Sequence, residues 1–350
     1  VLTSHETSRD ILLTDFVKSL QKYYQVASFD LKALENDPQK TLENLNRFEL
    51  LLISNPKKKF NYKEKYIIDQ YTIAGGKSIW LLNNFNLDKD SLFKTGGKSL
   101  ALFNDLNLDD LFFKYGIRLN RNIIEDMYCA PIVLAKGQNN ESEYIPIPFS
   151  YYPLSRPIQN NFIGKGNDEI ILRFPISIDT LRNNLDKEIL IKSSKLSRIK
   201  KIPFLISLEE SISSFSPSDF KTESKFLGVL IKGLFESAYK NKITPGKITA
   251  SKLENGKSEI IVIGDGELAE NQIEQNAPLE LGYDKWTNNF YSNKSFLNDC
   301  VHYLMKNESL LKIKNKETNI GLLNESKVSI NGVFWKIFML VIIPIFVYII

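Results

Sequence analysis

The first quarter of the chain alternates short apolar runs with segments whose apolar residues recur every three or four positions. This recurrence predicts a helix at Leu12–Tyr24 and a second helix whose last residues are Leu42–Leu45. The apolar runs Gln25–Phe29 and Phe48–Ile53 predict two strands, the second of them buried. The pattern therefore begins with helix, strand, helix and strand.

A third helix is expected after the second strand. Asn61 can cap its first turn, and Glu64 stands three residues later, as in a capping box. Its apolar stripe would consist of Tyr66, Ile67, Tyr71 and Ala74. Gly75 and Gly76 are expected to end the helix, and Ser78–Leu82 to form the next strand. Another helix and a strand at Ile117–Leu119 follow.

Strand, helix and strand joined by short connections, twice in succession, predict a mostly parallel sheet with helices on its faces. Phe226–Ile231 and Ile260–Ile263 read as later strands, and Tyr144–Leu208 reads as a series of short strands. The predicted fold class is α/β, flavodoxin-like or glutamine-amidotransferase-like, with a β-rich middle segment. We divide the chain into an α/β domain in two parts (1–125 and 226–311), a β-rich proline-containing segment between them (126–225), a charged linker (312–332) and a final apolar segment (333–350).

The final segment, VFWKIFMLVIIPIFVYII from Val333, carries no charge after Lys336. Its length and apolarity predict a truncated transmembrane helix, with Trp335 as an interfacial anchor. The alternative is a buried C-terminal helix, which would normally show a polar face. Since the chain begins with Val1 and is still apolar at Ile350, we expect it to be a piece of a longer protein.

Charge and composition exclude several classes of protein. The 45 basic and 41 acidic residues give a net charge of +4, which is too even for a nucleic-acid-binding protein. Two cysteines, Cys129 and Cys300, make no disulfide framework. With only two histidines, His5 and His302, far apart in the sequence, no zinc site is expected.

The sequence Gly-Gly-Lys-Ser occurs twice, at 75–78 and 96–99, and resembles the end of a phosphate-binding loop. That loop requires a glycine five residues before the second glycine of this sequence, where Tyr71 and Leu92 stand instead. The first copy also follows a helix, whose C-terminus carries the wrong partial charge for an anion. Both copies are therefore interpreted as backbone turns, and no nucleotide cofactor is expected.

The stretch 264–269, GDGELA, matches a dinucleotide-binding fingerprint and follows a predicted strand. Asp265 and Glu267 would, however, place carboxylates against a pyrophosphate. The stretch up to Asn293 reads as loop, without a clear strand that carries a ribose-binding acid. We therefore interpret 264–269 as a turn leaving the sheet. Catalysis on the same fold stays open as an alternative, in which Cys129 or Asp265 would serve a hydrolase or an amidotransferase-like enzyme.

Ligands of open parallel sheets bind beyond the carboxyl ends of the strands. Asn55, Asn83, Asn84 and Asp265 stand at such positions and are the candidate ligand-binding residues. The simpler interpretation of these residues is ordinary loop polarity. No catalytic residue, metal ligand or cofactor is assigned.

Five stretches, taken in order, resemble the GldG family of gliding-motility-associated ABC-transporter auxiliary proteins of Bacteroidetes, which are often labelled substrate-binding. They are LLISNPKKKFNYKEKYIIDQYTIAGGKSIWLL, LNLDDLFFKYGIRLNRNIIEDMYCAPI, FLGVLIKGLFESAYKN, SEIIVIGDGELAENQ and LGYDKWTNNFYSNKSFLNDCVHYLM. The resemblance extends over nearly the whole chain.

This resemblance implies an anchor in the cytoplasmic membrane, a soluble domain in the periplasm, and a permease subunit and a separate ATPase subunit as partners. It also implies an α/β sheet without catalytic residues. One departure lies at residues 4–7, where Ser-His-Glu-Thr stands in place of the Gly-His-Gly-Glu with which relatives tend to open. Any binding by that turn is in doubt for this chain.

The sequence thus predicts a non-enzymatic, membrane-anchored auxiliary subunit of an ABC-transporter complex. The alternatives are the enzyme described above and a purely structural scaffold. An apolar-lined cleft at the strand ends would favour a ligand-binding protein, whereas a filled, flat surface would favour the scaffold.

Overall fold

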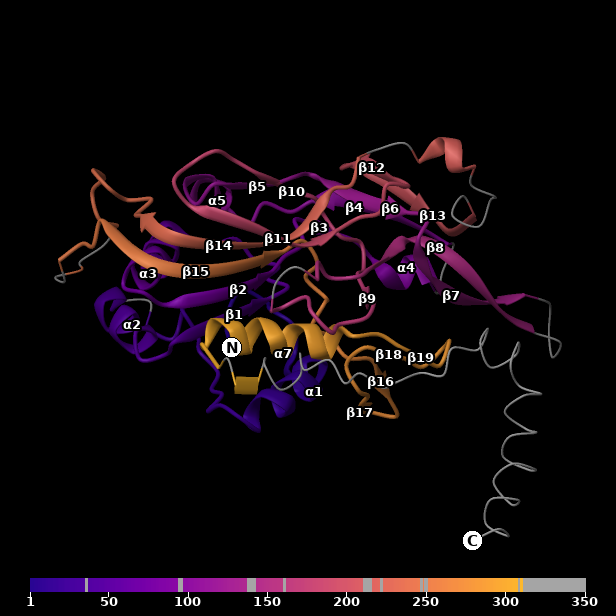
Figure 1. Ribbon diagram of the computed structural model, residues 1–350, viewed down its shortest axis with the longest axis horizontal. Helices are drawn as coiled ribbons and strands as arrows, with labels where there is room; N and C mark the ends of the chain where they lie inside the picture. The colour runs from indigo at the N-terminus through magenta and orange to yellow at the C-terminus, as the bar shows by residue number, and fades with distance from the viewer. Residues whose placement is uncertain are drawn as a thin grey trace, which may run out of the picture. The chain divides into compact units, whose positions relative to one another are not determined.

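A mixed five-stranded sheet forms the centre of the computed structural model (Figure 1). Its order is β1 (Leu50–Ser54), β2 (Lys77–Leu81), β15 (Asn255–Ile263), β14 (Phe226–Glu236) and β11 (Asp186–Lys192). The first three strands are parallel, whereas β14 runs antiparallel to both of its neighbours. The prediction of a mostly parallel sheet is therefore right in part: β11 runs in the same direction as the first three strands, but only two of the four strand pairings are parallel. The other two are antiparallel because β14 alone runs the opposite way, and its pairing with β15 needs no helical crossover.

The structure describes residues 1–34, 37–93, 97–136, 143–159, 162–209, 216–220, 223–245, 248, 251–307 and 309–310. The charged linker and the apolar run from Val333 lie outside these residues. Within the described part of the chain, no helix is long and apolar enough to cross a membrane.

The parallel pair β1–β2 is joined by α3 (Tyr62–Ile73), as the sequence predicts. Asn61 and Glu64 form the expected capping box at its start. At its end, Gly75 has a φ of +100°, a left-handed conformation that glycine adopts without steric strain. A side chain at Gly76 would place its Cβ 2.3 Å from the ring of Tyr71. The first Gly-Gly-Lys-Ser sequence is thus a helix end followed by a strand.

The second Gly-Gly-Lys-Ser sequence lies partly outside the described residues. Gly97 has a φ of +62° and immediately precedes β4 (Lys98–Phe103). Its lysine and serine are therefore strand residues here as well, which agrees with a backbone role.

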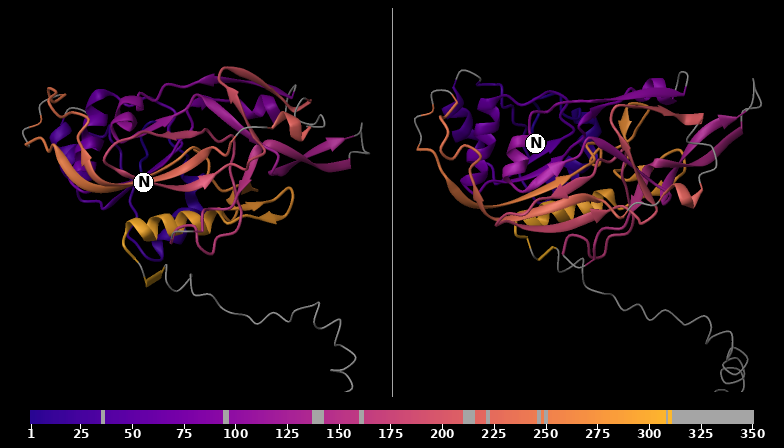
Figure 2. Two further views of the ribbon diagram at one scale, coloured as in Figure 1. Left: turned by 45° about the horizontal axis from the view of Figure 1, so that its top comes forward. Right: turned by 90° about the horizontal axis from the view of Figure 1, so that it is seen from above.

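Helices cover both faces of the central sheet (Figures 1 and 2). On one face, α1 (Asp10–Gln21) and α7 (Asn293–Leu304) pack against each other and form one apolar core with alternate strand residues such as Ile79 and Leu81. The opposite core lies beneath α2 (Pro38–Leu45), α3 and α5 (Asp109–Lys114), and includes Trp80 from β2. Successive strand residues thus supply the two cores alternately.

The series of short strands predicted at Tyr144–Leu208 is present. Besides β11, it contains β8 (Glu143–Ser155), β9 (Ile170–Ile171), β10 (Ile178–Thr180), β12 (Ser197–Lys201) and β13 (Phe204–Ser207). The strand predicted at Ile117–Leu119 is β5. The sequence did not predict β3 (Phe85–Asn86), β6 (Asn122–Asp126) and β7 (Cys129–Lys136), nor the short helices α4 (Lys89–Phe93) and η2 (Pro217–Asp219). The strands pair in two- and three-stranded sheets, mostly antiparallel to one another, and β7 with β8 makes the longest hairpin among them.

Two local predictions are wrong. Gln25–Phe29 is not a strand, because its only ladder contact is an isolated bridge between Phe29 and Leu2. The stretch from 264 to 293, expected to be loop, contains two small hairpins. Their strands are β16 (Ile273–Glu274), β17 (Ala277–Pro278), β18 (Tyr283–Asp284) and β19 (Asn289–Phe290). Strands of two residues leave too short a pattern for alternation to be visible in the sequence.

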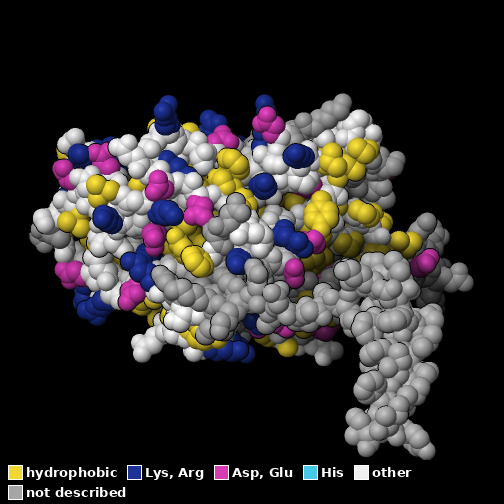
Figure 3. Space-filling model, viewed as in Figure 1, with side chains coloured by type: hydrophobic (Ala, Val, Ile, Leu, Met, Phe, Trp, Pro, Cys, Tyr) yellow, Lys and Arg dark blue, Asp and Glu magenta, His cyan; other side chains and the backbone are white. Residues whose placement is uncertain are grey.

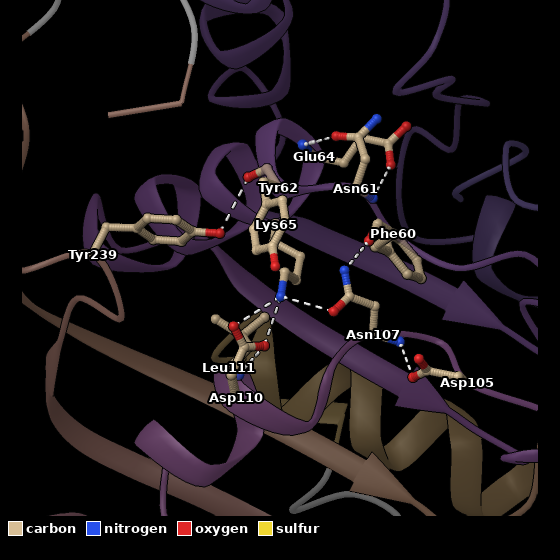
Figure 4. A network of polar contacts seen from close by, with 10 residues as sticks. All are labelled: Phe60, Asn61, Tyr62, Glu64, Lys65, Asp105, Asn107, Asp110, Leu111 and Tyr239. Carbon is tan, nitrogen blue, oxygen red and sulfur yellow. Dashed lines mark hydrogen bonds and ion pairs between the residues drawn. The ribbon is translucent and has the colours of Figure 1, made fainter. Parts of the chain in front are cut away.

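A buried lysine joins α3 to the segment that precedes α5 and to α5 itself (Figure 4). The side chain of Lys65 is 1% exposed, and its Nζ lies 2.7 and 2.8 Å from the two carboxylate oxygens of Asp110. The same Nζ donates to Asn107 Oδ1 at 3.4 Å. Three acceptors therefore compensate the desolvation of one ammonium group, which a buried charge requires.

Candidate functional site

Three of the four candidate residues at the strand ends meet one loop, which follows β15. Asp265 is fully buried, and its two carboxylate oxygens accept backbone N–H groups of Arg173 and Glu267, each at 2.8 Å. Asn83 Oδ1 accepts from Gly266 N at 3.1 Å. Asn55 Nδ2 donates to Glu270 Oε1 at 3.0 Å. The structure thus brings these side chains together, as their positions at parallel strand ends predict.

The fourth residue, Asn84, belongs to another contact. Its Nδ2 donates to the carbonyl of Asn120 at 3.0 Å, which ties the end of β2 to the loop after β5. Asn55 Oδ1 and Asn84 Oδ1 are buried, and neither has a hydrogen-bond partner among the described residues. A role for any of the four in ligand binding stays a prediction, whereas their role in holding loops is visible.

Charged residues that the sequence analysis did not assign surround the strand ends. Lys57 follows β1, Lys89 begins α4, and Arg173 lies just after β9. Lys89 Nζ forms an ion pair with Glu267, a residue that is 9% exposed. Glu270 Oε1 accepts the hydroxyl of Ser8 at 2.7 Å. The GDGE sequence signalled the acidic half of this cluster, but nothing local marked Arg173 or Lys89.

Burial and neighbouring charges move the pKa values of the cluster in opposite directions. Burial, followed by the charge of Glu267, raises the pKa of Asp265 to about 7. Burial would also raise the pKa of Glu267, but the charges of Lys89, Arg173 and Lys57 together outweigh burial, and the pKa lies below its ordinary value. Burial lowers the pKa of Lys57. Asp265 is thus the carboxyl group of the cluster whose charge changes near neutral pH.

A cleft of about 530 Å³ lies beside this cluster and shares Arg173 with it. Most of its lining is apolar or aromatic: Phe93, Pro131, Ile132, Val133, Leu134, Tyr144, Tyr152, Ile171 and Trp286. Its polar lining consists of Arg173, Gln272 and Asp284. Hydrophobic side chains gather toward the right of Figure 3, where Figure 1 places β7, β8 and β13. A mostly apolar cleft with a few polar groups is the usual form of a small-molecule site.

The residues of the enzyme alternative are not arranged for nucleophilic attack. Burial raises the pKa of the Cys129 thiol to about 11, so it stays protonated at neutral pH. The ring nitrogens of His5 lie 3.0 Å from Glu64 Oε2 and 2.9 Å from Ser4 Oγ, so neither is directed at a cysteine. Asp265 is buried with both oxygens bonded to backbone N–H groups. In the part of the chain that the structure describes, no group of three His, Cys, Asp or Glu residues could hold a metal ion.

The turn at residues 4–7 has a structural role in this chain. His5 and Glu6 have φ values of +67° and +50°, and the carbonyl of His5 accepts the backbone N–H groups of Lys57 and Lys58 at 2.9 and 3.0 Å. The His5 ring stacks on Phe60 with centroids 4.0 Å apart. A left-handed φ costs less at glycine than at glutamate, which explains why a glycine suits the position of Glu6.

Comparisons with known proteins give one family and a likeness to solved structures. A family model described as "ABC-type uncharacterized transport system" matches residues 1–300. No curated protein matches the chain. A solved structure titled "mmIFT52 N-terminal domain" is similar at 12% sequence identity and a TM-score of 0.47, over 87% of this chain and 95% of that one.

Proposed function

The chain belongs to the ABC-type uncharacterized transport system family, and we propose that it is a non-catalytic auxiliary subunit whose cleft beside Arg173 binds a ligand. Membership makes the chain an auxiliary component of an ABC-type transport system. The finer parts of the proposal are a flavodoxin-like or glutamine-amidotransferase-like sheet, a permease and a separate ATPase as partners, and a link to gliding motility. The resemblance of the five sequence stretches to gliding-associated auxiliary proteins supports these parts.

One observation carries the binding role: an open apolar cleft lies beside the strand ends. Asp265 and Asn83 are engaged in holding the loop after β15, so these two candidate residues are occupied within the protein. The cleft next to them is instead lined by side chains such as Tyr144 and Trp286, which are 68% and 64% exposed. A scaffold would not need a concave apolar surface of this size.

Purification of the full-length protein from native membranes tests the partnership. A permease subunit and an ATPase subunit are expected to co-purify with it in mild detergent. Recovery of the chain alone, under conditions in which an unrelated ABC transporter stays assembled, would contradict the auxiliary role. A deletion strain of the bacterium that encodes the chain tests gliding: loss of surface spreading, restored by the wild-type gene, is expected.

Membrane anchoring and a periplasmic location are also part of the proposal. The uncharged run after Lys336 supports an anchor, since about 20 apolar residues span a bilayer. A chain that ends at residue 332 is expected to leave the membrane fraction on carbonate extraction, whereas the full chain stays. Protease added to spheroplasts is expected to digest the soluble domain, and protection of that domain would place it in the cytoplasm instead.

A further inference from the structure

The cleft offers apolar contact along one continuous wall. Four consecutive residues of β7, Pro131–Leu134, line it, and each is half-buried. Phe93, Tyr152 and Trp286 add aromatic surface. Each square ångström of this surface that a ligand covers contributes about 25 cal/mol through the hydrophobic effect. The walls therefore select a ligand with an apolar body.

Arg173 is the cation of this cleft. Its charge acts on the nearby carboxyl groups of Asp265, Glu267 and Glu270, but its guanidinium group makes few hydrogen bonds. Its Nη1 donates to the carbonyl of Glu270 at 3.4 Å, which is its single hydrogen bond to the described residues. Across the described ranges it makes no ion pair within 4.0 Å. A guanidinium group has five N–H donors, so most of its capacity remains open. The hydroxyl of Tyr152, which also lines the cleft, likewise makes no hydrogen bond to a described residue.

The neighbouring carboxylates have other partners. Both oxygens of Asp265 accept backbone N–H groups, and Glu267 pairs with Lys89. Glu270 Oε1 accepts from Ser8 and Asn55. Within the cleft, Asp284 accepts from Gln272 Nε2 at 2.9 Å and from the Thr287 hydroxyl at 2.5 Å. These acidic groups make their hydrogen bonds with other residues, which leaves the N–H donors of the Arg173 guanidinium group available to a ligand.

We propose that the cleft binds a small amphipathic anion, a molecule with an apolar body and one carboxylate or phosphate group, with the anionic group on Arg173. The apolar body lies along Pro131–Leu134, and the Tyr152 hydroxyl donates to the anion. One available cation selects one anionic group, and a cleft of about 530 Å³ is within the range of small-molecule sites. This inference rests on the proposed binding role of the auxiliary subunit.

Photoaffinity labelling of the full-length protein in phosphatidylcholine nanodiscs tests the ligand class. The probe is dodecanoate that carries a diazirine on its chain, and mass spectrometry maps its adducts. Labelling is expected on Pro131–Leu134 and Trp286. Dodecanoate and dodecyl phosphate are expected to compete, whereas dodecanol, which lacks the charge, and butyrate, which lacks the tail, compete at least about tenfold less well.

Two variants test which side chains contact the anionic group of the ligand. Arg173→Gln is expected to weaken competition by dodecanoate at least about tenfold, since it removes a charge-assisted contact. Tyr152→Phe removes one hydroxyl and is expected to weaken it about threefold. The matched control is Arg156→Gln, because Arg156 is 61% exposed, lies beside Asp168 and does not line the cleft. Arg173 holds Asp265 through its backbone N–H, which the glutamine variant keeps, and circular dichroism checks that the variant is folded.

Several results would overturn the inference. If dodecanol competed as well as dodecanoate, the negative charge would contribute nothing to binding. If butyrate competed as well as dodecanoate, the apolar wall would contribute nothing to binding. Unchanged labelling of Arg173→Gln would remove the assigned contact. These competitor comparisons on the wild-type chain stand even if that variant fails to fold. Adding phosphatidylglycerol to the nanodiscs distinguishes two sources of the same chemistry. If phosphatidylglycerol competes with the probe, the ligand is a membrane phospholipid. If it does not compete, the ligand is a free amphiphile.

The failure of this inference differs from the failure of the proposed function. If permease and ATPase co-purify but no amphipathic anion binds, the auxiliary role holds and the ligand class is wrong. If the anion binds but the chain purifies alone, the ligand class holds and the partnership is wrong.

Discussion

Replacing Asp265 with asparagine should change how the stability of the protein depends on pH. The folded-state pKa of this carboxyl group is about 7, against 3.8 in the unfolded chain. Between these values the unfolded state loses the proton while the folded state keeps it. The contribution of Asp265 to stability is therefore fully present below pH 4 and is lost as the pH rises to about 7. The Asp265→Asn variant would carry no such dependence, because an amide does not titrate in this range.

The magnitude follows from the two pKa values. Their difference of about three pH units corresponds to about 4 kcal/mol of folding free energy. Asparagine keeps one acceptor for the two backbone N–H groups that Asp265 bonds, and loss of the other costs about 1–3 kcal/mol at every pH. The variant is therefore expected to be less stable than the wild type at pH 4 and more stable at pH 8.

Urea unfolding, followed by circular dichroism from pH 4 to pH 8, measures this crossing. Residues Val1–Lys314 form one compact unit, so a chain ending at Lys314 is suitable. The free energy of unfolding of Asp265→Asn minus that of the wild type should rise by about 4 kcal/mol over this range. Asp179→Asn, in an exposed ion pair with Arg118, is the control and should show a much smaller change. Parallel curves for Asp265→Asn and the wild type would refute the reasoning.

Three further results are expected. Asp69 is fully buried and accepts hydrogen bonds from Ser237, Ala238, Gln70 and Tyr115. Asp69→Ala should therefore lower the free energy of unfolding by about 3 kcal/mol or more. In the same denaturation assay, Asp179→Ala, which removes an exposed ion pair, should lower it by less than about 1 kcal/mol. Gly76→Ala should cost about 1–3 kcal/mol because its Cβ meets the Tyr71 ring, and a change below about 0.5 kcal/mol would contradict that packing. Alkylation of Cys129 by iodoacetamide should be slow at pH 7 and accelerate about tenfold per pH unit up to about pH 10, and rapid labelling at pH 7 would revive the cysteine enzyme.

The features that sequence reasoning predicted correctly depend on residues close together in the chain. The capping box joins Asn61 to Glu64 within one helical turn, and Gly75 ends the same helix through its own φ. Strand–helix–strand order predicts the parallel pair β1–β2. In each case the physical cause acts within a few residues, so the pattern is visible in the sequence.

The remaining features depend on pairings that no local pattern specifies. The order of strands beyond β2 depends on which edges meet, and both β14 and β15 read simply as buried strands. Asn83 and Asn84 adjoin in sequence but hold different loops, and no local pattern distinguishes the two residues. Arg173 reaches the cluster from a segment that is distant in sequence. Its place beside the cleft follows from the fold and could not be predicted from its neighbours in sequence.

The position of β15 in the sheet has a consequence for how the protein is made. This strand lies between β2 and β14, yet about 170 residues separate it from β2 in the sequence. During synthesis at about 5–20 residues per second, β2 therefore waits roughly 10–35 s for its second neighbour. Such a long-range parallel contact is slow to form, because a large loop must close before the pairing stabilises anything. The nascent chain thus carries an open, apolar sheet edge until most of it has been made, and this is the stage at which a chaperone would protect it.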